Sequence, residues 1–441
     1  MSTTTKPLPD TAPAPTTGRL DRLGIPRPLA PGFLGVLLTM TGVGVESNVV
    51  APHMVAVLGS PEATVATIVT AASLATLVGS YLSGALADLL GPRRVMTLGV
   101  AVWVVFELLF LGALQLGSVP LTAVAYTLRG FGHPLFAFAF LVWVNVTAPV
   151  ERRGAAVGWF YVAFTGGLPT LGSLFAIGAI PVLGGGVVGE TGAMAASVVL
   201  VLAGWAVAHL GVRLPSGSQR TAPADEPAWR VLTSGVRLAA TRPRVLAAFL
   251  VRLVNTAPEF GMFIVLPAVI AEDRGWGQQR WLLMTVCVYA TNILVNALFG
   301  WVGDRIGWVR TVRWFGVVGS AVGLLAWWYV PQLVPAGSDW GYVAAVVAGC
   351  VFGCSLAGFV PMGAIMPALE PRHKGAAMAM YTTAAGGAAF LGTGVVAVVF
   401  ALGGDGAAVT WTFVGLYACA FVLVGRLHVP QHRDAAHGDA S

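Results

Sequence analysis

Twelve apolar stretches of about 20 residues or more run along this chain of 441 residues. A stretch of this length forms a helix across a bilayer, because a helix satisfies its own backbone hydrogen bonds there. Only 10% of the residues are charged and 56% are apolar, whereas roughly a quarter are charged in soluble domains. The sequence therefore predicts an all-α membrane protein with twelve transmembrane helices. The predicted spans are 32–54, 66–90, 94–116, 119–148, 155–182, 191–210, 245–271, 281–303, 309–330, 341–368, 375–402 and 408–428.

A short charged motif occurs twice, at the ends of the second and the eighth stretch. The copies are Gly84-x-x-x-Asp88-x-x-Gly91-x-Arg93-Arg94 and Gly300-x-x-x-Asp304-x-x-Gly307-x-x-Arg310. Another pair of segments repeats at nearly the same offset of about 220 residues, Glu151-Arg152-Arg153-Gly154-Ala155-Ala156 and Glu370-Pro371-Arg372-His373-Lys374-Gly375-Ala376-Ala377. Two matches at one spacing indicate an internal duplication. They predict two pseudo-symmetric six-helix bundles, an arrangement typical of transporters.

The basic residues predict the orientation, because Lys and Arg of short loops stay on the cytoplasmic side. With the N-terminus inside, 21 of the 25 basic residues fall in cytoplasmic segments. Arg274 and Arg280 lie outside, and Arg129 and Arg252 lie within helices. We therefore expect both termini in the cytoplasm, and we attribute the net charge of +6 to this topology and not to nucleic-acid binding.

The longest polar interruption divides the predicted helices six and six. Within it, residues 229–240 have the pattern of an amphipathic helix on the membrane surface, with Arg230 and Arg237 toward lipid headgroups; a plain tether is the alternative. The first residues are rich in Pro and Thr and lack the apolar core of a signal peptide. The predicted organisation is a disordered cytoplasmic tail at 1–31, a six-helix bundle at 32–210, a cytoplasmic linker at 211–244, a second bundle at 245–428 and a cytoplasmic tail at 429–441.

Five charged side chains fall inside apolar spans: Glu46, Glu107, Arg129, Arg252 and Glu259. A charge facing lipid costs at least a few kcal/mol, so each of the five is expected to face a cavity or a partner.

Helical spacing groups these charges with other polar residues. The predicted faces are Thr39, Glu46 and His53; Arg252, Asn255 and Glu259; Arg129 and His133; and Tyr289, Asn292 and Asn296. Glu46 and Glu259 are near-equivalents under the repeat and are expected to face one another across a central cavity. The four faces together predict a polar site near the middle of the membrane.

Roles follow from the chemistry of these groups. Glu46 is a candidate proton carrier, with a fixed ion pair to Arg129 or Arg252 as the alternative. Glu259 is its counterpart in proton coupling, whereas Glu107 lies nearer the periplasmic half of its helix and is expected to be structural.

The remaining residues of the polar site are expected to bind the solute. His133 precedes a proline, so it either lines the pore or caps freed backbone groups. The neutral groups of Tyr289, Asn292 and Asn296 suit solute hydroxyls.

The repeated motif predicts a cytoplasmic gate. Asp88 is placed to pair with Arg93 or Arg94 and to meet the positive N-terminus of a helix from the other bundle. In the second copy Asp304 has the same relation to Arg305 or Arg310. The alternative is a topology anchor without a gating role.

The chain shows no sequence signature of an enzyme or of an ATP-driven pump. It contains no metal-ligand cluster, nucleophile elbow or Gly-x-x-x-x-Gly-Lys phosphate loop, so no cofactor is expected. The four cysteines are Cys287, Cys350, Cys354 and Cys419; all fall inside predicted helices, where we expect them to pack.

The block from Arg129-Gly130-Phe131-Gly132-His133-Pro134 to Trp143 resembles the polyol permease branch of the major facilitator superfamily, as does Thr41-Gly42-Val43-Gly44-Val45-Glu46. Val43 stands where that branch often has an acidic residue. The resemblance to the superfamily covers nearly all of 32–428. It implies a monomeric twelve-helix transporter of a bacterial inner membrane, with alternating access and proton-coupled uptake of a linear sugar alcohol. Relatives in the branch are also assigned to dicarboxylates such as 2-oxoglutarate.

The leading hypothesis is therefore a proton symporter for a pentitol such as ribitol or arabinitol. Arg129 would organise the site, and Asn255, Glu259, Asn292 and Asn296 would bind hydroxyls. The alternatives are a dicarboxylate symporter that uses Arg129 and Arg252 as carboxylate clamps, then a drug or metabolite exporter, and, from another class, a membrane sensor without transport.

Overall fold

The computed structural model describes the whole chain except residues 1–19, 21–22, 47–48, 221–225, 372–373 and 430–441. The described residues form helices joined by short turns and contain no β-strand. Among them, eleven helical segments are long and apolar enough to cross a membrane. The prediction of an all-α, multi-pass membrane protein is confirmed.

The first predicted span, 32–54, is not one helix, which is why eleven continuous segments are found and not twelve. It is divided between α2 (Ala30–Gly44) and α3 (Val50–Leu58). Pro52 lies in the first turn of α3, where its missing N–H removes no bond of the helix. In a helix running through this segment, the same proline would break the hydrogen-bond ladder. The interruption leaves Glu46 just beyond the end of α2.

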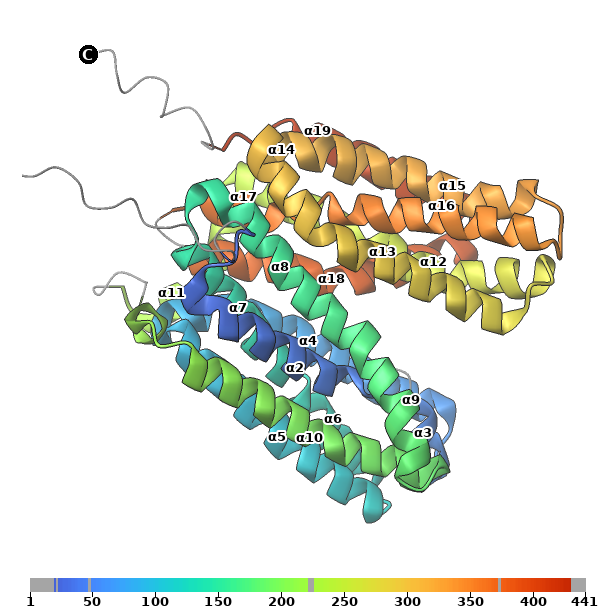
Figure 1. The fold of residues 1–441 in the computed structure, drawn as a ribbon, viewed down its shortest axis with the longest axis horizontal. Helices are drawn as coiled ribbons and strands as arrows, with labels where there is room; N and C mark the ends of the chain where they lie inside the picture. The colour runs from blue at the N-terminus through green and yellow to red at the C-terminus, as the bar shows by residue number, and fades with distance from the viewer. Residues whose placement is uncertain (1–19, 21–22, 47–48, 221–225, 372–373, 430–441) are drawn as a thin grey trace, which may run out of the picture.

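The helices of the first half of the chain pack into one group, coloured blue to green in Figure 1. Within it α2 packs along α10, and α5 packs along α7. Besides α2 and α3, the group contains α4 (Glu62–Leu90), α5 (Pro92–Gln115), α6 (Val119–Arg129), α7 (Gly132–Thr147), α8 (Arg153–Thr165), the π-helix η3 (Gly166–Leu171), α9 (Gly172–Val182) and α10 (Gly186–Gly211), with short 3-10 turns at η1 (Arg27–Leu29), η2 (Val150–Arg152) and η4 (Pro215–Ser218).

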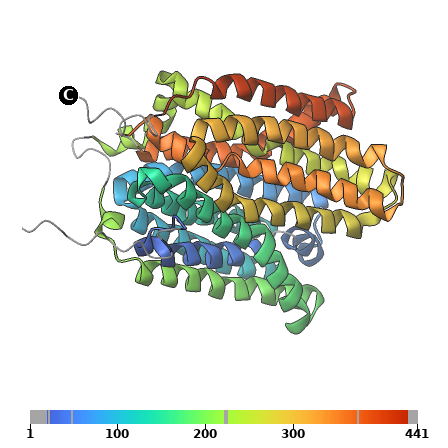
Figure 2. The ribbon, with the colours of Figure 1, turned by 45° about the horizontal axis from the view of Figure 1, so that its top comes forward.

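The second half forms the other group, coloured yellow to red, and the two groups lie side by side in both ribbon views (Figures 1 and 2). Here α12 packs along α18, and α15 packs along α16. The elements are α12 (Pro243–Pro267), the π-helix η5 (Ala268–Asp273), α13 (Gly277–Ile306), α14 (Trp308–Thr311), the π-helix η6 (Val312–Val318), α15 (Gly319–Leu333), α16 (Asp339–Ala357), α17 (Met362–Leu369), α18 (Lys374–Ala401) and α19 (Gly406–Val424).

The amphipathic helix predicted between the halves is present as α11 (Ala228–Thr241). One of its faces packs on α4 of the first half and on α12 and α18 of the second. The hydroxyl of Tyr81 on α4 donates a hydrogen bond to the carbonyl of Leu232 at 2.7 Å. Arg230 and Arg237 are exposed on the outer face. The linker helix therefore bridges the ends of both halves.

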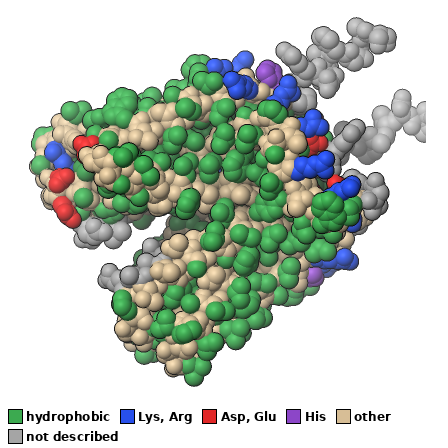
Figure 3. Space-filling model, turned by 180° about the vertical axis from the view of Figure 1, so that it is seen from behind, with side chains coloured by type: hydrophobic (Ala, Val, Ile, Leu, Met, Phe, Trp, Pro, Cys, Tyr) green, Lys and Arg blue, Asp and Glu red, His purple; other side chains and the backbone are tan. Residues whose placement is uncertain are grey.

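The two halves touch at one end of the molecule and separate at the other. The end at which α2 begins and α19 ends is called the terminal side below, and the opposite end the far side (Figure 1). Toward the terminal side, α8 packs against α13 and α4 against α18. On the far side the space-filling view shows a wedge-shaped opening between the halves (Figure 3). The same view shows most basic side chains gathered at the terminal side.

Candidate functional site

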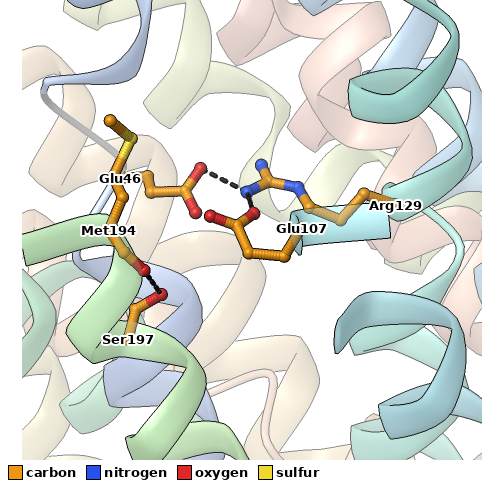
Figure 4. Close-up of polar contacts among 5 residues, drawn as sticks. All are labelled: Glu46, Glu107, Arg129, Met194 and Ser197. Carbon is orange, nitrogen blue, oxygen red and sulfur yellow. Dashed lines mark hydrogen bonds and ion pairs between the residues drawn. The ribbon is translucent and has the colours of Figure 1, made fainter. Parts of the chain in front are cut away.

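Arg129, the last residue of α6, lies between two carboxylates (Figure 4). Its Nη1 donates to Oε2 of Glu46 and, at 2.5 Å, to Oε2 of Glu107 on α5. Glu46 is 2% exposed, Glu107 is 0% exposed and Arg129 is 9% exposed. The sequence left Arg129 and Arg252 open as the partner of Glu46, and in the structure the partner is Arg129. Arg129 also binds a second carboxylate, that of Glu107.

Aromatic rings surround this cluster of Glu46, Glu107 and Arg129. The guanidinium carbon lies 4.3 Å from the centre of the Tyr126 ring, 5.5 Å from that of Phe110 and 5.6 Å from that of Trp103. Such contacts favour the cation but supply no counter-charge. Two ionised carboxylates and one guanidinium would leave a surplus negative charge in an apolar setting, which is costly.

The second oxygens, Oε1 of Glu46 and Oε1 of Glu107, have no hydrogen-bond partner among the described atoms. Ser197 of the neighbouring α10 does not serve them, since its hydroxyl donates to the carbonyl of Met194 at 2.6 Å (Figure 4). One proton on the carboxylate pair would balance the charge of the cluster. The arrangement is therefore chemically suited to take up and release a proton.

The predicted stripe of Thr39, Glu46 and His53 on one helix is wrong, because the first span is interrupted after α2. His53 lies on α3, and its Nδ1 is 2.7 Å from Oε2 of Glu190 on α10. Thr39 is buried on α2 beside Gly204. The three residues thus contact different neighbours.

Arg252 on α12 anchors a second cluster, in the other half. Its guanidinium lies 5.0 Å from the ring centre of Tyr381 on α18, and it is close enough to Tyr381 and Tyr161 to interact electrostatically with both. Tyr161 belongs to α8 of the first half, and its hydroxyl oxygen is 2.6 Å from that of Tyr381. Arg252 is only 5% exposed, and its Nε and Nη1 have no partner among the described atoms.

Glu259 lies on the same helix as Arg252, close enough for electrostatic interaction with it. Its carboxylate is close enough to Tyr289 on α13 for the two side chains to interact. The Tyr289 ring stacks on Phe263, with centres 5.8 Å apart. Glu46 and Glu259 thus belong to separate clusters, one in each half.

The amides of the predicted binding site are buried or half-buried. On α13, Nδ2 of Asn296 donates to Oδ1 of Asn292 at 3.2 Å, and Nδ2 of Asn292 donates to the carbonyl of Gly353 at 3.0 Å. Asn255 is buried, and its Oδ1 has no partner among the described atoms. The predicted alignment of Asn292 and Asn296 on one helix face agrees with the hydrogen bond between them.

His133 is half-buried in the first turn of α7. It lies close enough to Arg129 for the two side chains to interact electrostatically. The structure therefore brings His133 near the first cluster, and its pore-lining role stays a prediction.

Asp88 lies near the end of α4 and contacts the N-terminus of α18, a helix of the other half. Its Oδ2 accepts the backbone N–H of Ala376 on α18 at 3.2 Å. Gly84 makes this approach feasible, because a Cβ there would lie 2.4 Å from the carbonyl oxygen of Gly375. Gly91, with φ of 85°, then turns the chain out of α4.

The second copy of the motif repeats this geometry. Asp304 at the end of α13 accepts the N–H groups of Gly154 and Ala155 on α8, at 2.9 and 2.8 Å, and the indole N–H of Trp308 at 2.8 Å. A Cβ at Gly300 would lie 2.3 Å from the carbonyl oxygen of Gly154. Each carboxylate thus meets the positive end of a helix dipole across the boundary between the halves, as the sequence predicts.

The arginines of the motif lie at the terminal surface. Nη2 of Arg93 donates to the carbonyl of His209 at 2.6 Å. Arg94 and Arg310 are exposed, and exposed Arg305 lies over the Trp301 ring at 3.8 Å. The described partners of both aspartates are N–H groups, so the predicted pairing with these arginines stays a prediction.

Sequence reasoning missed two features. Glu107 was recognisable as an intramembrane charge, but spacing along one helix does not show which neighbouring helix it faces. The contact of Tyr161 with Tyr381 was detectable only through the repeat, because these residues are separated by the repeat offset of about 220 residues.

Among the described residues, no three His, Cys, Asp or Glu side chains are grouped to hold a metal ion. The four cysteines are present as free thiols.

The chain is similar to known transporters over nearly its whole length. The sequence profile of the Major Facilitator Superfamily matches residues 32–360. An alpha-ketoglutarate permease of Bacillus subtilis (strain 168) is 34% identical over 90% of this chain and 88% of its own length. From Klebsiella pneumoniae, a D-arabinitol transporter and a ribitol transporter are each 30% identical, over 94% and 92% of this chain and 96% and 93% of their own lengths.

A solved structure shows the same fold. A bacterial homologue of the iron transporter ferroportin superposes with a TM-score of 0.71, over 91% of this chain and 99% of its own, at 12% identity. The fold and the sequence relatives agree: this chain belongs to the Major Facilitator Superfamily, resembles its polyol transporter branch, and is a multi-pass secondary transporter of small solutes and not an enzyme.

Proposed function

We propose that the protein takes up a sugar alcohol, a pentitol such as ribitol or arabinitol, together with protons by alternating access. The observation that carries this proposal is the position of Arg129, which is bound by both Glu46 and Glu107. With two carboxylates on it, Arg129 is not available as a clamp for a carboxylate of the solute. When both carboxylates are ionised, the surplus negative charge of this cluster also disfavours a dianion. Two relatives named for pentitols support the same class of solute.

Neutral amide and hydroxyl groups would bind the solute. Tyr289, Asn292 and Asn296 lie along α13, and Asn255 presents an amide oxygen without a described partner. His133 contributes from the first half. Amides and hydroxyls suit a polyol because each hydroxyl is both a donor and an acceptor.

Proton coupling is assigned to Glu46 and Glu259. Glu46 would alternate between a proton and Arg129, so that protonation weakens its bond to the arginine. Glu259 would link its own protonation to the binding site through the hydroxyl of Tyr289. Each half then carries one coupling carboxylate.

The terminal side is assigned to the cytoplasm of a bacterial inner membrane, because basic residues gather there. The wedge would then open to the outside, and Asp88 and Asp304 with their motif arginines would form the closed cytoplasmic gate. The bodies that rock are 32–210 and 245–428, joined by 211–244. We propose that a monomer carries out the cycle.

A dicarboxylate such as 2-oxoglutarate is the second candidate solute. It is favoured by Arg252, whose Nε and Nη1 have no described partner, and by the relative named alpha-ketoglutarate permease. In this reading Arg252 binds one carboxylate, and release of Arg129 from its glutamates is needed for the other.

Thermal unfolding of the purified protein tests the proposal. Pentitols, hexitols, pentoses and dicarboxylates are compared at two pH values, because a ligand raises the melting temperature of the fold it binds. A shift with ribitol or arabinitol that Asn292→Ala removes supports the first candidate. A shift with dicarboxylates alone that Arg252→Gln removes supports the second and contradicts the first.

A further inference from the structure

Tyr161 and Tyr381 make a hydrogen bond between the two halves inside the membrane. Their hydroxyl oxygens are 2.6 Å apart, with Tyr161 on α8 and Tyr381 on α18. Each lies about two helical turns, roughly 10 Å, from the helix N-terminus that receives an aspartate of the repeated motif. The bond is therefore an inter-half contact set deeper than the contacts of the aspartates, and beside it the hydroxyl of Thr382 on α18 donates to the carbonyl of Ser80 on α4 at 2.6 Å.

Arg252 joins this pair to the inner wall of the second half. The guanidinium lies over the Tyr381 ring, and Arg252 interacts electrostatically with both tyrosines. Arginine offers five N–H donors and no acceptor, while each tyrosine offers one O–H. One tyrosine O–H is used by the other tyrosine. The tyrosine oxygens also accept, but the Nε and Nη1 groups of Arg252 have no partner among the described atoms.

A cluster with surplus donors recruits acceptor oxygen atoms, because a buried donor without a partner costs more than a typical hydrogen bond gains. Hydroxyl and carboxylate oxygens both fit. A solute oxygen that accepts from Arg252 and from a tyrosine O–H competes with the bond between the tyrosines. Solute binding and separation of the halves would thus use the same atoms.

We propose that Arg252, Tyr161 and Tyr381 form a solute-sensing latch. With the site empty, the tyrosine pair holds α8 against α18. A solute oxygen bound at Arg252 replaces one partner of the pair and lets the halves part on the terminal side. The inference rests on the proposed alternating access, but it does not depend on which solute is carried.

Distances between spin labels test the latch. In a protein whose four cysteines are replaced by Ser, labels are placed at Leu90 and Ile306, which are 39% and 41% exposed and end α4 and α13. Tyr161→Phe, Tyr381→Phe and the double variant each remove the hydrogen bond and keep the ring. Tyr342→Phe is the matched control, because its hydroxyl donates to the carbonyl of Arg280 within the second half.

Without solute, each latch variant is expected to raise the ratio of long to short distances about fivefold to tenfold, the effect of losing one hydrogen bond. The double variant is expected to match either single variant, because both remove the same bond. Unchanged distances in both single variants, additive effects, or an equal change in Tyr342→Phe would overturn the proposal.

A second arm separates the latch from the proposed function. D-arabinitol and 2-oxoglutarate are added to the wild-type chain and to the variants. A solute that populates the long distance in the wild type and has a smaller effect in the latch variants supports solute sensing. If neither compound changes the distances in the wild type, the proposed solutes are wrong. The distances measured without solute still show whether the tyrosine pair holds the halves together.

Discussion

Glu46 and Glu107 accept hydrogen bonds from the same nitrogen, Nη1 of Arg129, although Glu107 lies on α5 and Glu46 lies just beyond the end of α2. Because two buried carboxylates share one guanidinium, a single proton determines the net charge of this cluster. This relationship links the fold to the proposed coupling, because Glu46 lies in the interruption between α2 and α3.

Replacing Glu46 by Gln is expected to abolish uphill uptake and to keep exchange. The amide cannot gain or lose a proton, but it retains the shape of the side chain and an oxygen for Arg129. Uptake against a gradient and counterflow are measured in the same proteoliposomes. A variant that still concentrates solute contradicts the role of Glu46, and Asp339→Asn, at a side chain 87% exposed, is the control.

Replacing Arg129 by Gln is expected to lower the free energy of unfolding by about 3–5 kcal/mol, because it leaves two buried carboxylates without a cation. Adding Glu46→Gln and Glu107→Gln to this variant should restore much of the loss, since no net charge then stays buried. Thermal or denaturant unfolding in detergent measures both effects. Equal instability of the single and the triple variant would show that the loss comes from packing around Arg129.

Replacing Asp88 by Asn is expected to slow transport without removing solute binding. The amide oxygen still accepts the N–H of Ala376, but the charge that faces the helix dipole, worth about 0.3–2 kcal/mol, is lost. Asp304→Asn should also slow transport, because the amide keeps only one of the two oxygens that accept the N–H groups of Gly154 and Ala155. Transport rate and equilibrium binding are measured separately. Loss of binding in either variant contradicts the gate.

Replacing Gly84 by Ala is expected to favour separation of the halves on the terminal side. The added Cβ would lie 2.4 Å from the carbonyl oxygen of Gly375 and 2.6 Å from the amide nitrogen of Ala379, so backbone must move. Gly112→Ala on α5 is the control, because no atom lies within 4 Å of its Cβ position. Spin-label distances across the terminal side should lengthen only in the first variant.

The motif contacts followed from the sequence because their determinants are local and repeated. A carboxylate at a helix end, two glycines and a matching segment about 220 residues away specify both the partner and its orientation. The interruption at Glu46 did not follow. An apolar run shows that a segment enters the membrane, but it does not show that the helix within it is continuous.

The choice between Arg129 and Arg252 as the partner of Glu46 also needed the structure. Spacing assigns a residue to a face of its own helix, whereas the pairing depends on how helices are rotated and ordered in space. The latch residues show the same limit, since Tyr161 and Tyr381 look like packing residues until their helices are placed together.

Uptake into proteoliposomes measures proton-coupled transport of a pentitol directly. D-arabinitol and 2-oxoglutarate are offered outside vesicles under an acid-outside pH gradient, with and without a protonophore. D-arabinitol is expected to accumulate above its outside concentration, and the protonophore is expected to abolish this accumulation. Accumulation of 2-oxoglutarate alone, or D-arabinitol uptake that ignores the gradient, would contradict the proposed function.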